Sequence, residues 1–161
     1  MHAQVNEALQ RAGVKTTWVD EQRLDSDLNN EMSDGIDQSR LVLIFVTRAY
    51  IEKVQGYGRR GPDEACKAEF EYALRRHGVK RMLAVVMDPE CRDTSSWTGA
   101  VGFRLGSQIY HDLSGDGVDQ ERLNGLVAAM GNMGVHPPVN VLAAAATSPN
   151  TRQAQRKFFS L

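Results

Sequence analysis

One acidic side chain lies where it could act on a ligand. In the helix expected from residue 62 onward, Cys66, Phe70 and Ala73 recur at helical spacing and should face a sheet. Glu69 lies about 60° off this apolar stripe, so its carboxylate is expected at the margin between core and solvent. Such a position suits a catalytic carboxylate, although a solvated surface glutamate is the simpler interpretation of an isolated Glu.

Other side chains that could react or bind a ligand are more simply explained by structural or solvent-exposed roles. Cys66 lies on the apolar stripe and is expected to be a core cysteine. Asp88, Glu90 and Asp93 flank a proline turn, where solvated carboxylates are more common than a cation site. Glycines 99, 102 and 106 do not follow a strand and open a helix, so they predict a flexible loop instead of a dinucleotide-binding turn. We therefore predict no metal site.

The segment before this helix is fully apolar. Residues 41–46 (LVLIFV) predict a strand buried on both faces, as in a parallel sheet covered by helices. A loop of roughly fifteen residues, rich in glycine, is expected next, and its length favours a binding role. The helix then begins at Pro62 and ends before Gly78, with acidic residues in its first turn and basic residues in its last.

The remaining chain alternates helices and strands. Helical spacing predicts helices over residues 3–12 and 27–38 and around 123–130, whereas strands are expected over 14–19, 81–87 and 107–113. Residues 90–106 are expected to form a loop. This order predicts an α/β sandwich with a parallel sheet, whose sites lie at the carboxyl ends of the strands. Asp20 ends one of those strands.

Composition limits the function classes. The 161 residues predict one main domain, and 19 basic against 20 acidic residues give a net charge of -1. No global basic field therefore favours nucleic acid or a membrane surface. Two cysteines fit neither a disulfide framework nor a clustered metal site, which favours a reducing cytoplasmic setting.

Four stretches in a fixed order carry a family resemblance. They are residues 13–20 (GVKTTWVD), 35–40 (GIDQSR), 66–69 (CKAE) and 97–99 (WTG). Together they resemble the Toll/interleukin receptor (TIR) domain over residues 3–131, which implies a flavodoxin-like three-layer sandwich. We expect the usual first strand of this family to be missing, and its absence would split the remaining strands into two pairs. Ala65 stands where family enzymes often have an aromatic residue.

The resemblance implies two function classes. Some TIR domains are non-enzymatic scaffolds or adaptors that signal by TIR–TIR association, and others cleave NAD+ to nicotinamide and linear or cyclic ADP-ribose, using a glutamate that matches Glu69. NAD+ is then the substrate and no cofactor is implied. The implied partners are a second copy or another TIR domain. Another nucleotide-binding flavodoxin-like domain is the alternative. The residues expected to bind substrate are Trp18, Asp20, Arg23, Leu24, Tyr50 and Tyr57.

The carboxyl-terminal residues differ in character from the rest. We assign residues 1–134 to the TIR-like domain and 135–161 to a tail. Residues 139–144 (VNVLAA) could replace the missing strand by inserting between the strands at Val14 and Met82. An Ala-rich linker is the alternative interpretation.

Overall fold

The fold is built on a parallel sheet of three strands, β1 (Val42–Val46), β2 (Met82–Val86) and β3 (Tyr110–Asp112), in the order β1-β2-β3. The computed structural model describes residues 7, 9–11, 33–59, 61, 65–117 and 119–134. Val42 lies beside Met82, and Ala84 lies beside Tyr110. The parallel sheet predicted from the apolar strands is thus confirmed.

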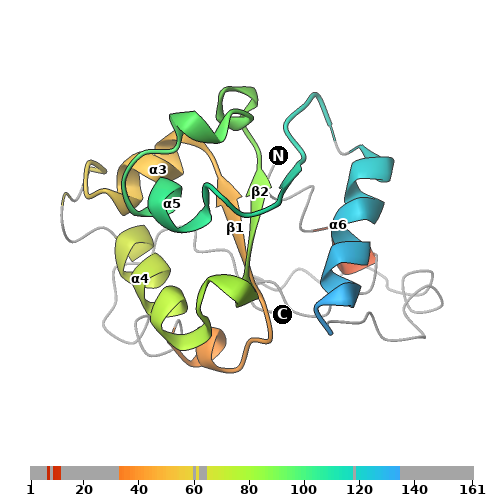
Figure 1. Ribbon diagram of the computed structural model, residues 1–161, viewed down its shortest axis with the longest axis horizontal. Coiled ribbons are helices and arrows are strands. Elements are labelled where there is room, and N and C mark those ends of the chain that lie inside the picture. Colours follow the sequence, from red (N-terminus) through yellow and green to blue (C-terminus); the bar gives the residue numbers. More distant parts are fainter. Residues whose placement is uncertain are drawn as a thin grey trace, which may run out of the picture.

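Helices cover both faces of this sheet. α3 (Arg48–Val54), α4 (Ala65–His77) and α5 (Gly99–Leu105) lie on one face, and α6 (Gln120–Asn132) lies on the other (Figure 1). Residues 33–37 form a further helical segment before β1. The expected three-layer α/β sandwich is therefore confirmed in the part of the chain that the structure describes.

Alternation along the strands divides the core into two clusters. Val42, Ile44 and Val46 of β1 face α3, α4 and α5, whereas Leu43 and its neighbour Leu41 face α6. Helix residues complete each cluster. The residues that α3, α4 and α5 contribute to the first cluster are Ile51, Val54, Phe70, Ala73, Val101 and Leu105. Those of α6 in the second cluster are Leu123, Leu126 and Met130.

The central strand of the described sheet is β2. It pairs with β1 along one edge and with β3 along the other, so both of its edges are hydrogen-bonded. A further strand therefore has no place beside Met82, and the expected insertion of the tail there is wrong. The strands are also not split into two pairs, because β1, β2 and β3 form one continuous sheet. Residues 12–32 and 135–161 lie outside the described part of the chain.

The long loop expected after β1 contains the helix α3. Thr47 caps it, because its side-chain oxygen accepts a hydrogen bond of 3.0 Å from the Tyr50 backbone N–H. Ile51 and Val54 are buried at 1% and 2% exposure, which anchors the helix to the sheet. The three glycines that favoured a loop lie after this helix. The prediction of a continuous loop over residues 47–61 is therefore wrong.

The segment expected as a loop over residues 90–106 is mostly helical. It contains the 3-10 helices η3 (Pro89–Cys91) and η4 (Thr94–Ser96), followed by α5. Gly102 lies against Trp97, and a Cβ atom at Gly102 would lie 1.8 Å from the Trp97 carbonyl oxygen. This glycine therefore permits close packing and does not mark a flexible loop. β3 is also shorter than the strand predicted over residues 107–113.

Candidate functional site

The carboxyl ends of the strands meet at one edge of the sheet. Because β1, β2 and β3 are parallel, the segments that follow them share this edge. The backbone N–H of Arg48, at the start of α3, donates a 2.9 Å hydrogen bond to Oδ2 of Asp88, which follows β2. This bond ties the two neighbouring strand ends together.

Glu69 and Tyr50 form a cluster beyond the carboxyl end of β1. Tyr50 comes from α3 and Glu69 from the first half of α4, two helices that pack against each other. Glu69 is half-buried, as expected from its position at the margin of the apolar stripe. Cys66, one turn earlier on α4, is also half-buried and packs against the core cluster. The expected packing of Cys66 against the core is therefore found, with the side chain partly exposed.

The environment of Tyr50 keeps its phenol neutral. Burial is the largest cause that raises the pKa of Tyr50 well above its usual value of 10.0, and the negative charges of Glu69 and Cys66 raise it further. Tyr50 therefore keeps its hydroxyl proton at physiological pH. It offers a hydrogen-bond donor and an aromatic face close to the Glu69 carboxylate.

The other predicted site residues are not placed in this cluster. Tyr57 follows α3 and is 77% exposed, so it does not share the shielded environment of Tyr50 and Glu69. Trp18, Asp20, Arg23 and Leu24 lie outside the described residues. Of the predicted site, the structure thus brings together Tyr50 and Glu69.

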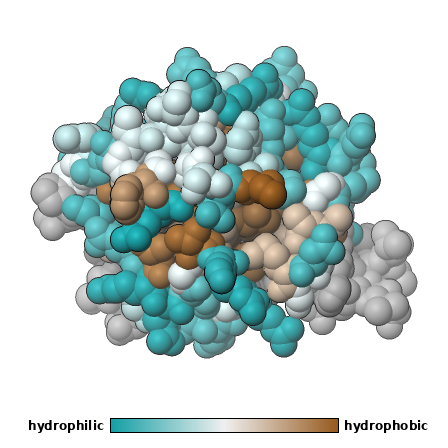
Figure 2. Space-filling view, viewed as in Figure 1, coloured by the Kyte–Doolittle hydropathy of each residue, from teal (hydrophilic) through white to brown (hydrophobic). Residues whose placement is uncertain are grey.

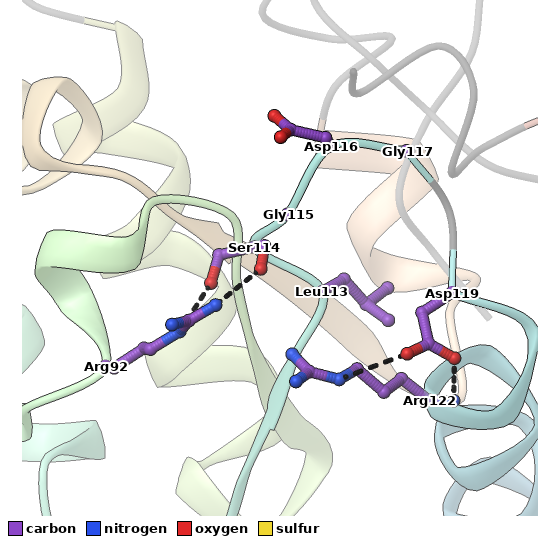
Figure 3. Close-up of a pocket in the computed structure, with 8 residues that line it drawn as sticks. All are labelled: Arg92, Leu113, Ser114, Gly115, Asp116, Gly117, Asp119 and Arg122. Carbon is purple, nitrogen blue, oxygen red and sulfur yellow. Dashed lines mark hydrogen bonds and ion pairs between the residues drawn. The ribbon is translucent and has the colours of Figure 1, made fainter.

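A second polar cluster lies beyond the carboxyl ends of β2 and β3. Asp112 Oδ2 lies 3.0 Å from Nε of Arg92 and 2.7 Å from Nη1 of Arg122. Arg92 also donates to Ser114, with distances of 3.0 Å to Oγ and 2.8 Å to the carbonyl oxygen. Arg92, Ser114 and Arg122 line a pocket beside α6 (Figure 3). Sequence reasoning missed this cluster, because its two arginines are 30 positions apart in a predicted loop and a helix.

Asp112 is the acceptor that joins this second cluster. Burial acts to raise the pKa of Asp112, but hydrogen bonds from Ser114 and the charges of Arg122 and Arg92 outweigh it and lower the pKa below 3.8. Ser114 donates to Asp112 through its hydroxyl and through its backbone N–H, the latter at 2.9 Å. The carboxylate therefore stays ionised at neutral pH and fixes both arginines.

Comparison with known proteins gives one finding. The TIR domain family profile matches residues 1–127 of the chain. The chain belongs to the TIR domain family. The resemblance seen in residues 13–20, 35–40, 66–69 and 97–99 is thereby confirmed, together with the α/β fold that it implied. No curated protein and no solved structure matches this TIR domain.

The described helices of this TIR domain are short. None of them is long and apolar enough to cross a lipid bilayer. The two cysteines, Cys66 and Cys91, are both in the described part and form no disulfide.

Proposed function

We propose that this TIR domain signals in the cytosol by association with other TIR domains and cleaves the nicotinamide–ribose bond of NAD+, with Glu69 as the catalytic residue. The observation that carries the proposal is the half-buried Glu69 beside Tyr50 at the carboxyl edge of the sheet. Ligands of open parallel α/β sheets bind at this edge. The family includes enzymes of this class, which makes the chemistry a natural assignment.

A single carboxylate meets the main demand of this reaction. Nicotinamide leaves as a neutral molecule from a cationic precursor, so the leaving group needs little acid catalysis. The ribosyl carbon develops positive charge as an oxocarbenium-like centre, and a nearby carboxylate stabilises that charge. Partial burial of Glu69 strengthens this interaction, because water screens the two charges less.

Tyr50 supports the carboxylate without competing with it. The phenol is neutral at physiological pH, as tyrosine ordinarily is, so no second negative charge forms beside Glu69, and the raised pKa extends this to higher pH. The hydroxyl can donate a hydrogen bond to a ribose oxygen, and the ring can stack on the nicotinamide. We therefore assign Tyr50 a substrate-binding role.

Nicotinamide release from NAD+ by concentrated protein tests the proposal. We expect Glu69→Gln to abolish release, because the neutral amide cannot stabilise the ribosyl cation. Glu71→Gln is the matched control, since Glu71 is exposed two residues later on the same helix, and its activity should equal that of the wild type. Equal release by Glu69→Gln and wild type would remove Glu69 from the mechanism.

Exposed hydrophobic residues on the surface support the second function class, a scaffold without enzymatic activity. Hydrophobic residues gather in the middle of one face, between α4 and α5 on one side and α6 on the other (Figure 2). Phe103 on α5 and Ile109 before β3 are 80% and 84% exposed. Exposed apolar side chains of this size suit a protein–protein contact. A wild type that releases no nicotinamide at any concentration but self-associates would favour the scaffold.

A further inference from the structure

The pocket beyond β3 is separate from the cluster around Glu69. It has a volume of about 460 Å³ and lies between the segment after β2, the segment after β3 and the start of α6. Leu113 and the backbone of Gly115 contribute to its wall (Figure 3). A cavity of this size falls in the range that holds small organic ligands.

Two arginines bring unused hydrogen-bond donors to this pocket. Arg92 and Arg122 both line it, and their guanidinium groups point toward one another (Figure 3). Among the described residues, Nε of Arg92 contacts Ser114 and Asp112, and its Nη2 contacts Ser114. Nη1 of Arg122 contacts Asp112, and its Nε contacts Asp119. Because a guanidinium carries five N–H donors, donors remain on both arginines. Their side chains are 49% and 45% exposed.

The acceptors around the pocket are already engaged. Oδ1 of Asp112 accepts two hydrogen bonds from Ser114, and its Oδ2 forms ion pairs with Arg92 and Arg122. Asp119 caps α6 by accepting from the backbone N–H groups of Glu121 and Arg122. Asp116 points away from the two guanidinium groups (Figure 3). The pocket therefore presents more free donors than free acceptors.

We propose that this pocket binds a small phosphorylated ligand, whose phosphate group accepts hydrogen bonds from both Arg92 and Arg122. Arginine forks match the oxygens of phosphate and form the stronger, charge-assisted hydrogen bonds. Arg92 and Arg122 stand against three carboxylates, those of Asp112, Asp116 and Asp119, so recognition depends on directed donors and not on a positive field.

The size and wall of the pocket define the rest of the ligand. Inorganic phosphate alone would fill a small part of about 460 Å³. The side chains that line the pocket, apart from Leu113, are polar or absent, which suits a hydroxylated group more than an aromatic ring. A sugar phosphate has this chemistry, and ribose 5-phosphate is a suitable probe.

Calorimetric titration of the full chain with ribose 5-phosphate tests the proposal. We expect saturable binding that Arg92→Gln and Arg122→Gln each weaken about tenfold, the loss typical of one charge-assisted hydrogen bond. Arg75→Gln is the matched control, because it removes the same charge from the exposed last turn of α4 and should leave the affinity unchanged. Free ribose should not bind, inorganic phosphate should bind more weakly, and citrate should not displace the sugar phosphate.

A third variant separates binding from folding. Gly115 lines the pocket, its backbone lies outside the left-handed region, and no atom lies within 4 Å of an added Cβ. Gly115→Phe should therefore keep the melting temperature and abolish binding, even if the arginine variants unfold. Glu69→Gln should bind ribose 5-phosphate as the wild type does, because Glu69 belongs to the other cluster.

Several results would overturn the proposal. A Kd weaker than about 10 mM for the wild type shows that the pocket takes no phosphate ligand. Equal weakening by Arg75→Gln and Arg92→Gln shows a general charge effect. Unchanged binding in Gly115→Phe, or lost binding in Glu69→Gln, places the ligand elsewhere. Displacement by citrate shows that the pocket prefers carboxylates.

Discussion

The indole N–H of Trp97 donates a 2.8 Å hydrogen bond to the backbone carbonyl of Cys91. Trp97 is 4% exposed, and its ring packs in a tilted arrangement against Tyr110 of β3, with 5.7 Å between the ring centroids. The bond closes the segment of 3-10 helices after β2, and the ring contact attaches that segment to the sheet. Trp97 therefore holds the two 3-10 helices between β2 and α5 together and against the sheet.

Trp97→Phe should lower the free energy of unfolding by about 1–3 kcal/mol. The variant leaves the buried Cys91 carbonyl without its donor and leaves part of the indole volume unfilled. Urea denaturation measures the change. Phe103→Leu is the control, since Phe103 is 80% exposed and its replacement should cost less than about 0.5 kcal/mol. Equal stability of Trp97→Phe and wild type would show that the hydrogen bond contributes nothing.

A pair of glycine variants should change stability in opposite directions. Gly102→Ala should destabilise the protein by more than about 2 kcal/mol, because its Cβ would lie 1.8 Å from the Trp97 carbonyl oxygen. Gly125→Ala in α6 should stabilise it by up to about 1 kcal/mol, because no atom lies within 4 Å of the added Cβ and alanine favours the helix. Thermal melts of both variants provide the measurement, and a stable Gly102→Ala contradicts the packing described for α5.

Stability should fall when the pH decreases below 6.5. Burial lowers the pKa of His111 below its ordinary value of 6.5, so the folded state binds its proton later than the unfolded state does. The stabilisation that comes from neutral His111 is fully present above pH 6.5. It is lost as the pH falls through the lower pKa of the folded state, where the free energy of unfolding changes by at most about 1.4 kcal/mol per pH unit.

His111→Gln provides the comparison for this pH effect. Glutamine stays neutral, so the variant should lose less stability than the wild type between pH 6.5 and about 5. The carboxylates of Asp37, Asp93 and Asp112 have pKa values lowered from 3.8, so their stabilisation is lost mainly as the pH falls through 3.8, below this window. Parallel pH profiles of the two proteins would exclude His111 as the cause.

Activity should depend on protein concentration if the domain works by association. Residues 20–27 carry Asp20, Glu21, Asp25 and Asp27 against one Arg23, and this acidic segment could pair with Arg59, Arg60 or Arg104 of a second copy. Arg104 stacks on Phe103 at 5.1 Å, which places charge next to an exposed apolar ring. Arg104→Glu should therefore move the concentration dependence to higher protein concentrations.

Lys80→Glu makes the same charge change at a different place. Lys80 is exposed in the short helix η2 (Val79–Arg81), at the amino end of β2 and away from the proposed contact. It should behave as the wild type in sedimentation and in nicotinamide release. A wild type that stays monomeric, with a constant specific activity over a thousandfold concentration range, contradicts association as the mechanism.

The sequence predicted the buried strands and the longer helices well. Residues 41–46 and 81–87 are continuous apolar runs, and their pattern reflects burial between two layers of helices. The short helices α3 and α5 were missed, because each spans 7 residues and lies next to glycines that favour a loop. Only glycine fits at position 102, because of its tertiary contact with Trp97, which no local sequence pattern reveals.

The candidate site was predictable only where it depends on local sequence spacing. Glu69 follows from helical spacing, because its position relative to Phe70 and Ala73 fixes its distance from the core. The pocket between Arg92 and Arg122 depends on tertiary contacts of Asp112 with segments far away in sequence. The rule that sites follow the carboxyl ends of strands could have indicated Arg92 and Ser114, which both come shortly after a strand.

Hydrogen bonds along both edges of β2 fix the distance between β1 and β3. Two strand spacings separate β1 from β3, roughly 10 Å across the sheet. The Glu69 cluster beyond β1 and the arginine pocket beyond β3 are therefore both attached to this sheet, with β2 between them. If both proposed sites bind their ligands, a bivalent compound that joins a nicotinamide-like head to a phosphate head through a linker long enough to reach both gains affinity, because binding of the first head raises the local concentration of the second.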